Sequence, residues 1–440
     1  MHVNRLNNKH ILSYVAGYGK RSGSICLLLV YILSIFAVGG ASRLVVSAII
    51  VGLLMILVFK KEFLFALPCM VFFYSELVFI GGISVFRVYT LLYFMRAIVL
   101  HIRFDKSQLL AMLAPYAYIV LYTLMVVMPN DLRLALFICL DFTFIYLYAA
   151  ELKSAGYLGL FFDFIAFAGV SASIFGLISP ASSVVGQNFD GQYVIVQRYL
   201  ATFEDVNYAG FFFNLAIIST ITSQTLIRDI KAKIPVLAIL YLALIRTGST
   251  TAYIVNVLLI LLFLLVRYKS RIVKPFFIMC ALLAMFIALF QIGLRNPDID
   301  FLHAIALRLN DKISALLAGD MDTFTTLRSS LSSKHFDYYV RQDSIFKLLL
   351  GGNAVSGQYL NTSTFSEMAH NEYIDLLLNV GMLGFAVLVG KQCFVVAQLL
   401  GAAKCEGSSL ALLLSKISFL LYGCTLTMFL NPRFYLFFFL

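Results

Sequence analysis

Long apolar runs recur along most of the chain and are separated by short polar segments. The runs hold about 17 to 22 residues, enough for a helix to cross the roughly 30 Å hydrocarbon core of a bilayer. Inside a membrane, a helix satisfies its backbone hydrogen bonds within itself. The pattern predicts about 12 to 13 transmembrane helices, near residues 24–40, 44–59, 63–80, 83–100, 109–128, 132–149, 157–178, 207–226, 234–246, 250–266, 273–294, 373–400 and 409–430.

The composition agrees with an all-α, polytopic membrane protein. The 440 residues are 61% hydrophobic and 12% charged, whereas soluble domains are nearer half apolar. The net charge of +11 does not indicate nucleic-acid binding, because the cytoplasmic loops of membrane proteins collect Lys and Arg. With the N-terminus inside, the inward segments carry most of the cations, namely Arg5, Lys9, Lys20, Arg21, Lys60, Lys61, Arg103, Lys106, Lys153, Arg228, Lys231, Lys233, Arg267, Lys269, Arg271, Lys274 and Lys404.

The same alternation defines the domain organisation and places two long segments outside the cytoplasm. We expect a cytoplasmic segment at 1–23, and a helix bundle at 24–294 that contains the outer loop 179–206. A large helical extracytoplasmic loop at 295–372 and C-terminal helices with an apolar tail at 373–440 follow. The first apolar run has no small-residue cleavage site, which favours an uncleaved signal anchor. The cysteines lie in apolar runs or in an inward loop, so no disulfide framework is expected outside.

Charged residues inside the apolar runs should be paired or face water, because each costs a few kcal/mol at a helix centre. Glu76 and Arg87 flank the Gly81-Gly82 turn symmetrically. We expect them to face each other, either as an ion pair that pins a hairpin or with Arg87 lining an anionic cavity. Asp141 and Asp163 flank an inward turn in the same way. Hydrogen bonding to a neighbouring helix is their expected role, and a raised pKa at a shared depth is the alternative.

Three further features near the bilayer carry no expected chemistry. Arg96 and Lys391 are expected to snorkel towards the interface. The tail 434–440 is too short to span the membrane, and its place is left open between the interface and the bundle.

Two cations lie at predicted outer turns beside helix starts. Arg198 precedes Asp205 and Asn207, and either of these two can cap the next helix. A guanidinium beside a helix N-terminus suits a diphosphate, since its planar fork binds phosphate oxygens and the helix end adds partial positive charge. A solvated surface cation is the alternative. Arg246 stands just before Ser249, where another helix begins, and either ends the preceding helix or joins the same anion site.

His370 and Asn371 stand directly before the apolar run that starts at 373. Asn371 can cap that helix. A histidine at a membrane–water boundary can exchange a proton near neutral pH. Gly381 and Gly384 further along let another helix or a lipid tail approach closely. A histidine that only occupies the interface is the alternative.

The large loop contains two Asp-x-Asp strings, Asp298-Ile299-Asp300 and Asp320-Met321-Asp322. Metal-dependent sugar transferases use such strings to hold a divalent ion. Both strings lie outside, away from cytosolic sugar nucleotides, and the sequence has no α/β nucleotide domain. We therefore expect these acids to solvate or cap loop helices, and we expect neither a metal nor a cofactor.

Between residues 195 and 395 the motifs follow a characteristic order. An outer-loop Arg with Thr-Phe-x-Asp-x-Asn comes first, then Thr-Gly-Ser, a large outer loop, and His-Asn-x-Tyr-x-x-x-Leu-x-x-x-Gly-x-x-Gly. This order resembles the O-antigen polymerase and ligase family. The chain departs from the family's pattern at Ala201, Val206 and Thr250, where Gly, Pro and often Arg are usual.

The resemblance implies a glycosyltransferase that joins undecaprenyl-diphosphate-linked repeat units on the outer face of the bacterial inner membrane, without metal or nucleotide sugar. Arg198 would hold the diphosphate, with Arg246 or Arg87 beside it. His370 would orient or deprotonate the acceptor hydroxyl, next to the substrate-binding Asn371. The anomeric configuration would invert.

The resemblance also extends to the large loop and to partners. Arg328 and Arg341 precede an amphipathic segment that ends in a Gly turn at 351–352, and would guide the glycan or a second diphosphate. The expected partners are the lipid-linked glycan, the bilayer and a chain-length regulator protein. An O-antigen ligase that transfers the glycan to lipid A-core is the first alternative. A lipid-linked oligosaccharide flippase is another, although carriers usually contain internal repeats that this sequence lacks.

Overall fold

The chain folds as an α-helical membrane protein. The computed structural model describes residues 22–78, 82–100, 102, 106–124, 128, 131–179, 182–189, 192–268, 277, 280, 284, 287–288, 290–296, 300–325, 328–342, 344–351, 370–402, 407–426, 428 and 431–440, and within 182–198 it describes the backbone. Among these described residues, five helices are long and apolar enough to cross a membrane, namely α3, α7, α8, α11 and α17.

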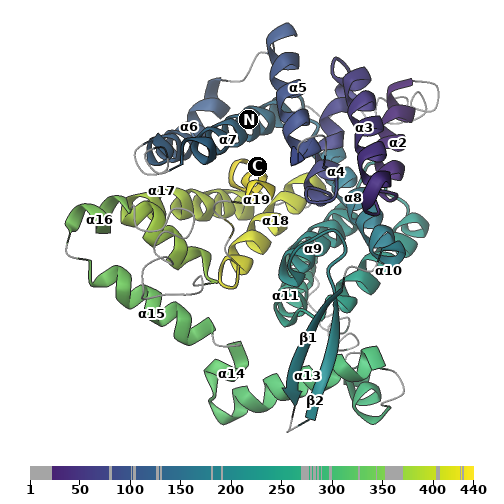
Figure 1. Cartoon of the computed structure of the whole chain (residues 1–440), viewed down its shortest axis with the longest axis vertical. Helices are drawn as coiled ribbons and strands as arrows, with labels where there is room; N and C mark the ends of the chain where they lie inside the picture. The colour runs from purple at the N-terminus through teal and green to yellow at the C-terminus, as the bar shows by residue number, and fades with distance from the viewer. Residues whose placement is uncertain are drawn as a thin grey trace.

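The helices form one bundle in which α9 and α18 lie at the centre (Figure 1). In chain order the described helices are α2 (Ser22–Ser34), α3 (Gly40–Leu57), the 3₁₀ helix η2 (Lys61–Ala66), α4 (Leu67–Phe72), α5 (Val85–Val99), α6 (Lys106–Tyr122), α7 (Leu132–Ser154), α8 (Leu158–Ile178), α9 (Val206–Thr222), α10 (Ile230–Arg246), α11 (Thr250–Arg267), α13 (Asp300–Ala318), α14 (Met321–Thr325), α15 (Arg328–Val340), α16 (Ile345–Leu350), α17 (Glu372–Ala402), α18 (Gly407–Gly423) and α19 (Pro432–Phe439).

Most predicted spans correspond to one helix, whereas the run predicted as one span at 63–80 is divided. It still leads from the end of α3 back to the level of Arg43 near the start of α3, which pairs with Glu76. That segment forms η2 followed by the six-residue α4, and both are buried by their neighbours. Pro68 lies in the first turn of α4 and lacks the N–H that a continuous helix would need there. The span predicted at 273–294 lies largely outside the described residues.

The predicted outer loop 179–206 contains strands, which the all-α prediction did not include. β1 (Ser182–Phe189) pairs antiparallel with β2 (Gln192–Tyr199), and Phe189 lies opposite Gln192. The sequence Asp190-Gly191 between the two strands is a strong two-residue hairpin signal, and the second strand is rich in β-branched residues.

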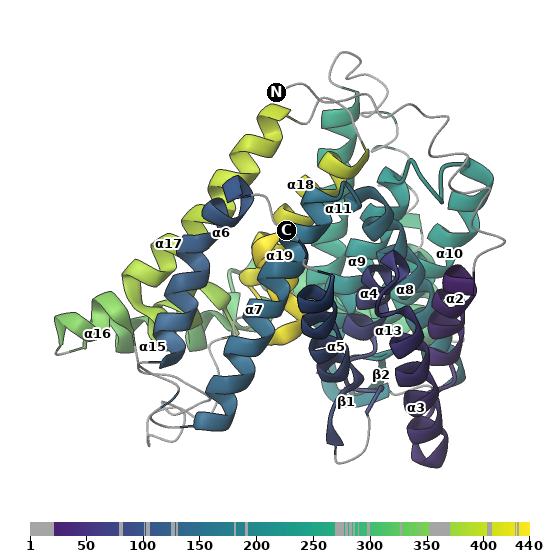
Figure 2. The same cartoon turned by 90° about the horizontal axis from the view of Figure 1, so that it is seen from above.

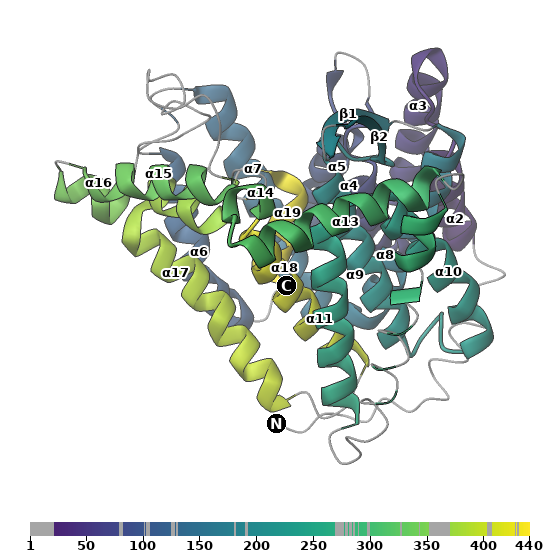
Figure 3. The same cartoon turned by 90° about the horizontal axis from the view of Figure 1, so that it is seen from below.

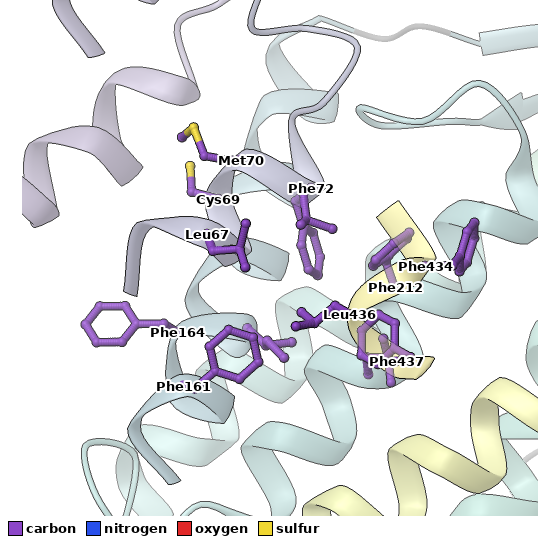
Figure 4. Packing of buried hydrophobic residues seen from close by; sticks show 14 of the residues in the cluster. Leu67, Cys69, Met70, Phe72, Phe161, Phe164, Phe212, Phe434, Leu436 and Phe437 are labelled. Carbon is purple, nitrogen blue, oxygen red and sulfur yellow. The ribbon is translucent and has the colours of Figure 1, made fainter. Parts of the chain in front are cut away.

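The C-terminal tail, whose place was left open, folds into the bundle as α19. Phe434 and Phe437 pack against Phe212 of α9, with ring centroids 5.4 and 6.4 Å apart (Figure 4). Lys416 of α18 and Lys153 of α7 donate hydrogen bonds to the carbonyls of Phe437 (2.5 Å) and Phe439 (2.7 Å). These ammonium groups offset the partial negative charge at the end of α19.

The charges inside the bundle are paired, but with other partners than predicted. Glu76 forms an ion pair with Arg43 of α3, and Arg87 lies 3.7 Å from Asp141 of α7. The predicted Glu76–Arg87 pair is therefore wrong, because the chain leaves helix after α4 and the two residues are not on the arms of a helical hairpin. The hydrogen bonding expected of Asp163 and Asp141 is confirmed for Asp163 alone, whose carboxylate accepts from Leu226 N at 2.7 Å in the connection after α9, whereas Asp141 forms the ion pair with Arg87.

The expected snorkelling of Arg96 is also wrong. Its guanidinium is buried and donates to the carbonyls of Val58 and Lys60, both at 2.8 Å, and lies 3.3 Å from Glu151. Because carbonyls and a carboxylate inside the bundle satisfy the guanidinium, it does not extend to water. Lys391 lies over the ring of Phe439, 5.4 Å from its centroid, and does not extend to the interface either.

The helices of the large loop, α13 to α16, form a row that crosses one end of the bundle (Figure 3). The N-termini of α9, α11 and α17 lie at this end, which we call the site end. α17 is interrupted at Gly381, whose φ of 65° is non-helical. Its long second part descends from the level of α16 and runs beside α6 (Figures 2 and 3).

Candidate functional site

The starts of α9 and α11 are joined by a hydrogen bond between two motif residues. Ser249 Oγ donates to Asn207 Oδ1 at 2.6 Å, and both side chains are buried. Asp205 caps α9 by accepting from Asn207 N at 2.6 Å, and Ser249 caps α11 by accepting from Ala252 N at 3.2 Å. Asp205 is therefore the cap among the two residues that the sequence offered. The Thr-Phe-x-Asp-x-Asn and Thr-Gly-Ser motifs form one structural unit.

Of the two cations predicted next to these helix starts, the structure describes the side chain of Arg246 and only the backbone of Arg198. Arg246 ends α10 with its guanidinium 5.1 Å from the ring centroid of Tyr199, whose hydroxyl donates to Ser173 O at 2.7 Å. Arg198 lies on β2 directly before Tyr199, and its backbone is opposite Ser183 in β1. The side chain of Arg198 is outside the described residues, so its direction stays a prediction.

His370 lies immediately before α17 and is exposed at the site end. Its φ of 51° is in the left-handed region, which few residues other than Gly adopt and which histidine tolerates better than most. Asn371 Oδ1 accepts from Tyr373 N at 3.1 Å and from Ile374 N at 3.4 Å. The predicted capping role of Asn371 is confirmed, and the cap fixes where His370 leaves the helix.

A short segment after α18 ties the start of α17 to the large loop. The buried carboxylate of Glu372 accepts a hydrogen bond from Met428 N. Three residues earlier, Thr425 O accepts from Arg328 Nη1 of α15 at 3.0 Å. Asp205 of α9 is also close enough to Arg328 to oppose the lowering of its pKa by burial. Arg328 therefore lies among the helix starts that carry the other motifs.

Two cations that sequence reasoning missed join Arg328. Arg308 and Lys312 are four residues apart on α13, and each interacts electrostatically with Arg328. Burial and then Arg308 lower the pKa of Lys312 to about 8. Arg308 Nε and Nη1 are buried and make no hydrogen bond within the part of the chain that the structure describes. We call Arg308, Lys312 and Arg328 the cation cluster.

The cation cluster combines like charges with buried donors, and the nearby carboxylates of Asp205, Asp311 and Asp320 oppose the lowering of its pKa values without reversing it. A bound anion would therefore stabilise the cluster further. Arg308 is also close enough to Tyr253, in the first turn of α11, for the two groups to interact. The N-terminus of α11 adds partial positive charge on that side. The sequence signal was the pair of cations spaced four apart among apolar residues of α13, which is also what the solvated face of an amphipathic helix shows.

Arg433 in α19 is a further buried cation that sequence reasoning did not assign to a site. Its side chain is 1% exposed, and its three guanidinium nitrogens find no hydrogen-bond partner among the described residues. Glu204 Oε1 lies 3.6 Å away. The guanidinium also lies over Tyr74 and Phe203, 5.1 and 5.6 Å from their ring centroids. Arg433 thus presents unused donors close to the cap of α9.

The other predicted cations are placed apart from this group. Arg87 is held by α7, with its guanidinium 3.5 Å from the ring centroid of Phe137 as well as near Asp141. Arg341 follows the last residue of α15 and is exposed. The structure brings Arg328 to the site end beside the motifs, and gives Arg87 a structural ion pair.

The second Asp-x-Asp string caps loop helices, as expected. Asp320 Oδ1 accepts from Thr323 N at 3.0 Å. Asp322 Oδ1 accepts from Ser329 Oγ at 2.6 Å and from Ser330 N at 3.2 Å. These hydrogen bonds lower the pKa of both carboxyl groups. In the first string, residue 298 is outside the described residues.

A small hollow of about 10 Å³ lies between α17 and α18 beside the start of α17. Its lining is mostly apolar and comprises Glu372, Tyr373, Leu376, Leu388, Val389, Gln392, Phe419, Leu420, Gly423 and Met428. At that size it has room for about one water molecule and not for a hydrocarbon chain.

The chain matches no family model, no curated protein and no solved structure. The function must therefore be argued from the residues and their geometry.

Proposed function

We propose that the protein is a glycosyltransferase that uses an undecaprenyl-diphosphate-linked glycan as donor and polymerises O-antigen or related repeat units. The observation that carries the proposal is the convergence of the motif-bearing segments at the site end. Asn207 bonds to Ser249, Arg328 bonds to Thr425, and Glu372 bonds to Met428 three residues later. Cations, helix N-termini and a histidine therefore share one end of the bundle.

The chemistry requires a held diphosphate and an activated hydroxyl. The acceptor oxygen attacks the anomeric carbon from the face opposite the diphosphate, and the bond from that carbon to the diphosphate oxygen breaks. The bonding electrons leave on undecaprenyl diphosphate, whose growing charge the cation cluster and Arg198 or Arg246 would stabilise. The hydroxyl proton passes to His370. One positioned proton acceptor contributes about 10² to 10⁴ in rate.

Sidedness follows from the distribution of Lys and Arg. We propose a cytoplasmic N-terminus, about 12 to 13 crossings, and a site end that faces the periplasm of a bacterial inner membrane. The helical loop 295–372 would then be extracytoplasmic, where flipped lipid-linked units are presented. This placement keeps the cation cluster next to the diphosphates of the outer leaflet.

Reconstitution into vesicles tests the proposal. Purified protein is given lipid-linked repeat units isolated from the source cells, and products are separated by length. A ladder supports a polymerase, and product that forms only after lipid A-core is added supports the ligase alternative. His370→Ala should lower the rate by about 10² to 10⁴, whereas Lys334→Ala, an exposed position on α15, should leave it unchanged.

Cells that carry His370→Ala separate transfer from transport. Loss of a transferase leaves single lipid-linked units exposed on the outer face, where a membrane-impermeant label reaches them. Loss of a flippase keeps these units inside, and that result would refute the proposal.

A further inference from the structure

The backbones of α16 and α17 touch at two glycines. Gly351 ends α16 with φ 77°, and Gly381 interrupts α17 with φ 65°. A Cβ on Gly351 would lie 2.3 Å from Asn379 O, and a Cβ on Gly381 would lie 2.4 Å from Leu349 O. The end of α16 is therefore fixed against the interruption in α17.

The interruption gives the depth of this joint in the membrane. From Met382 to Ala402, α17 continues for about 21 residues, which cover about 31 Å at 1.5 Å per residue. That length matches one bilayer core. The first part of α17 contains the polar residues Glu372, Asp375 and Asn379, which are buried against protein. Gly381 therefore lies where the hydrocarbon core meets the headgroups at the site end, and α16 lies at the same level (Figure 3).

Large apolar side chains of α16 are exposed at this level. Ile345 is 66% and Phe346 is 71% exposed. The next residues of α17 below the joint, Met382 and Leu383, are also exposed and belong to the membrane-spanning part. The exposed side of α16 is thus continuous with a surface that acyl chains already cover.

α15 also exposes apolar side chains, on a different face from its exposed charged residues. Phe336 and Val340 are four residues apart on one face, and both are exposed. Lys334 and Asp337 are exposed on another face. A helix with an apolar face and a charged face lies in the membrane interface, with the apolar face about 5–10 Å into the headgroup and acyl boundary.

We propose that α15 and α16 form an interfacial anchor, with Ile345 and Phe346 inserted among the acyl chains of the leaflet at the site end. The occupant of this apolar surface is lipid, because the joint at Gly381 holds α16 at the depth where acyl chains begin. The anchor fixes the loop relative to the bilayer, so that Arg328 at the other end of α15 keeps its height above the membrane. The proposal is independent of the reaction that the site performs.

The chain contains no tryptophan, so a single substitution gives a fluorescent probe without background. Phe346→Trp and Lys334→Trp are each reconstituted into phosphatidylcholine vesicles, with or without bromine on the acyl chains near the headgroup. We expect bromolipid to reduce the emission of Phe346→Trp at least about twofold, as for a side chain buried at the acyl boundary. We expect aqueous iodide to quench Lys334→Trp and to spare Phe346→Trp.

Quenching of Phe346→Trp by iodide and not by bromolipid would overturn the proposal. Protection from both quenchers that disappears when the protein is diluted in lipid would also overturn it, because a second copy would then cover α16. Ile345→Trp repeats the measurement one residue away, in case the first variant does not fold.

Discussion

Replacing Gly381 with alanine tests the joint between α16 and α17. Gly381 carries φ 65°, and the new Cβ would lie 2.4 Å from Leu349 O and 2.5 Å from Gly351 N. The backbone at φ 65° and ψ −176° is open to essentially glycine alone and costs an alanine about 1–3 kcal/mol. The contacts are shorter than backbone atoms tolerate, so α16 must also move away from α17.

Separation of α16 would expose the small cluster beneath it. Leu378 is fully buried and packs with Tyr339 and Leu348 at this joint. Exposing one fully buried large apolar side chain costs about 1.5–3 kcal/mol. Together with the backbone cost, we expect Gly381→Ala to lower the free energy of unfolding by about 3–6 kcal/mol.

Two glycines provide matched controls for this measurement. Gly319 has φ 74° but nothing within 4 Å of a new Cβ, so Gly319→Ala should cost only the backbone part, about 1–2 kcal/mol. Gly390 is helical within α17 and also has nothing within 4 Å, so Gly390→Ala should gain about 0.5–1 kcal/mol. Equilibrium unfolding in detergent micelles, followed by circular dichroism, compares the three variants. Equal losses for Gly381→Ala and Gly319→Ala would refute the contact between the two backbones.

Three other changes probe the site end. Lys312→Arg keeps a cation in the cluster. Binding of a short-chain polyprenyl diphosphate to the wild type should weaken as the pH rises through about 8, because Lys312 loses its proton there. Calorimetric titration should show no such weakening of binding in the variant. Arg433→Met removes a buried cation that makes no hydrogen bond among the described residues but lies 3.6 Å from Glu204. Because Glu204 is 70% exposed and stays solvated, the free energy of unfolding should fall by less than about 1 kcal/mol while transfer is lowered, and a larger loss of stability with normal transfer would show a structural role. Asp205→Ala removes the cap of α9 and should cost about 1 kcal/mol in unfolding experiments, and an unchanged midpoint would argue against the cap.

Hydropathy predicted the spanning helices because a long apolar run in a bilayer, such as α7, α8 or α11, satisfies its backbone hydrogen bonds within itself only as a helix. The same signal did not show that the run at 63–80 divides into η2 and the six-residue α4, both of which are buried by their neighbours. Caps were also predictable, since Asn371 and Ser249 act within three residues of their own position.

Pairings between distant segments could not be read in this way. Glu76 pairs with Arg43, and Arg87 pairs with Asp141, because three-dimensional packing brings segments together that are distant in the sequence. The four-residue spacing of Arg308 and Lys312 is also typical of a solvated helix face, and only the tertiary contacts of α13 bury Arg308 Nε and Nη1. The positions of site cations therefore depend on tertiary contacts that periodicity does not record.

Binding and transfer measured on the same variants test the central claim most directly, namely that one end of the bundle holds the diphosphate with cations and activates the acceptor with His370. The account predicts that His370→Ala loses transfer but binds undecaprenyl diphosphate with an affinity within about twofold of the wild type. Arg308→Gln should weaken the affinity at least about tenfold, which is equivalent to about 1.4 kcal/mol. Unchanged binding in Arg308→Gln, or loss of binding in His370→Ala, would contradict it.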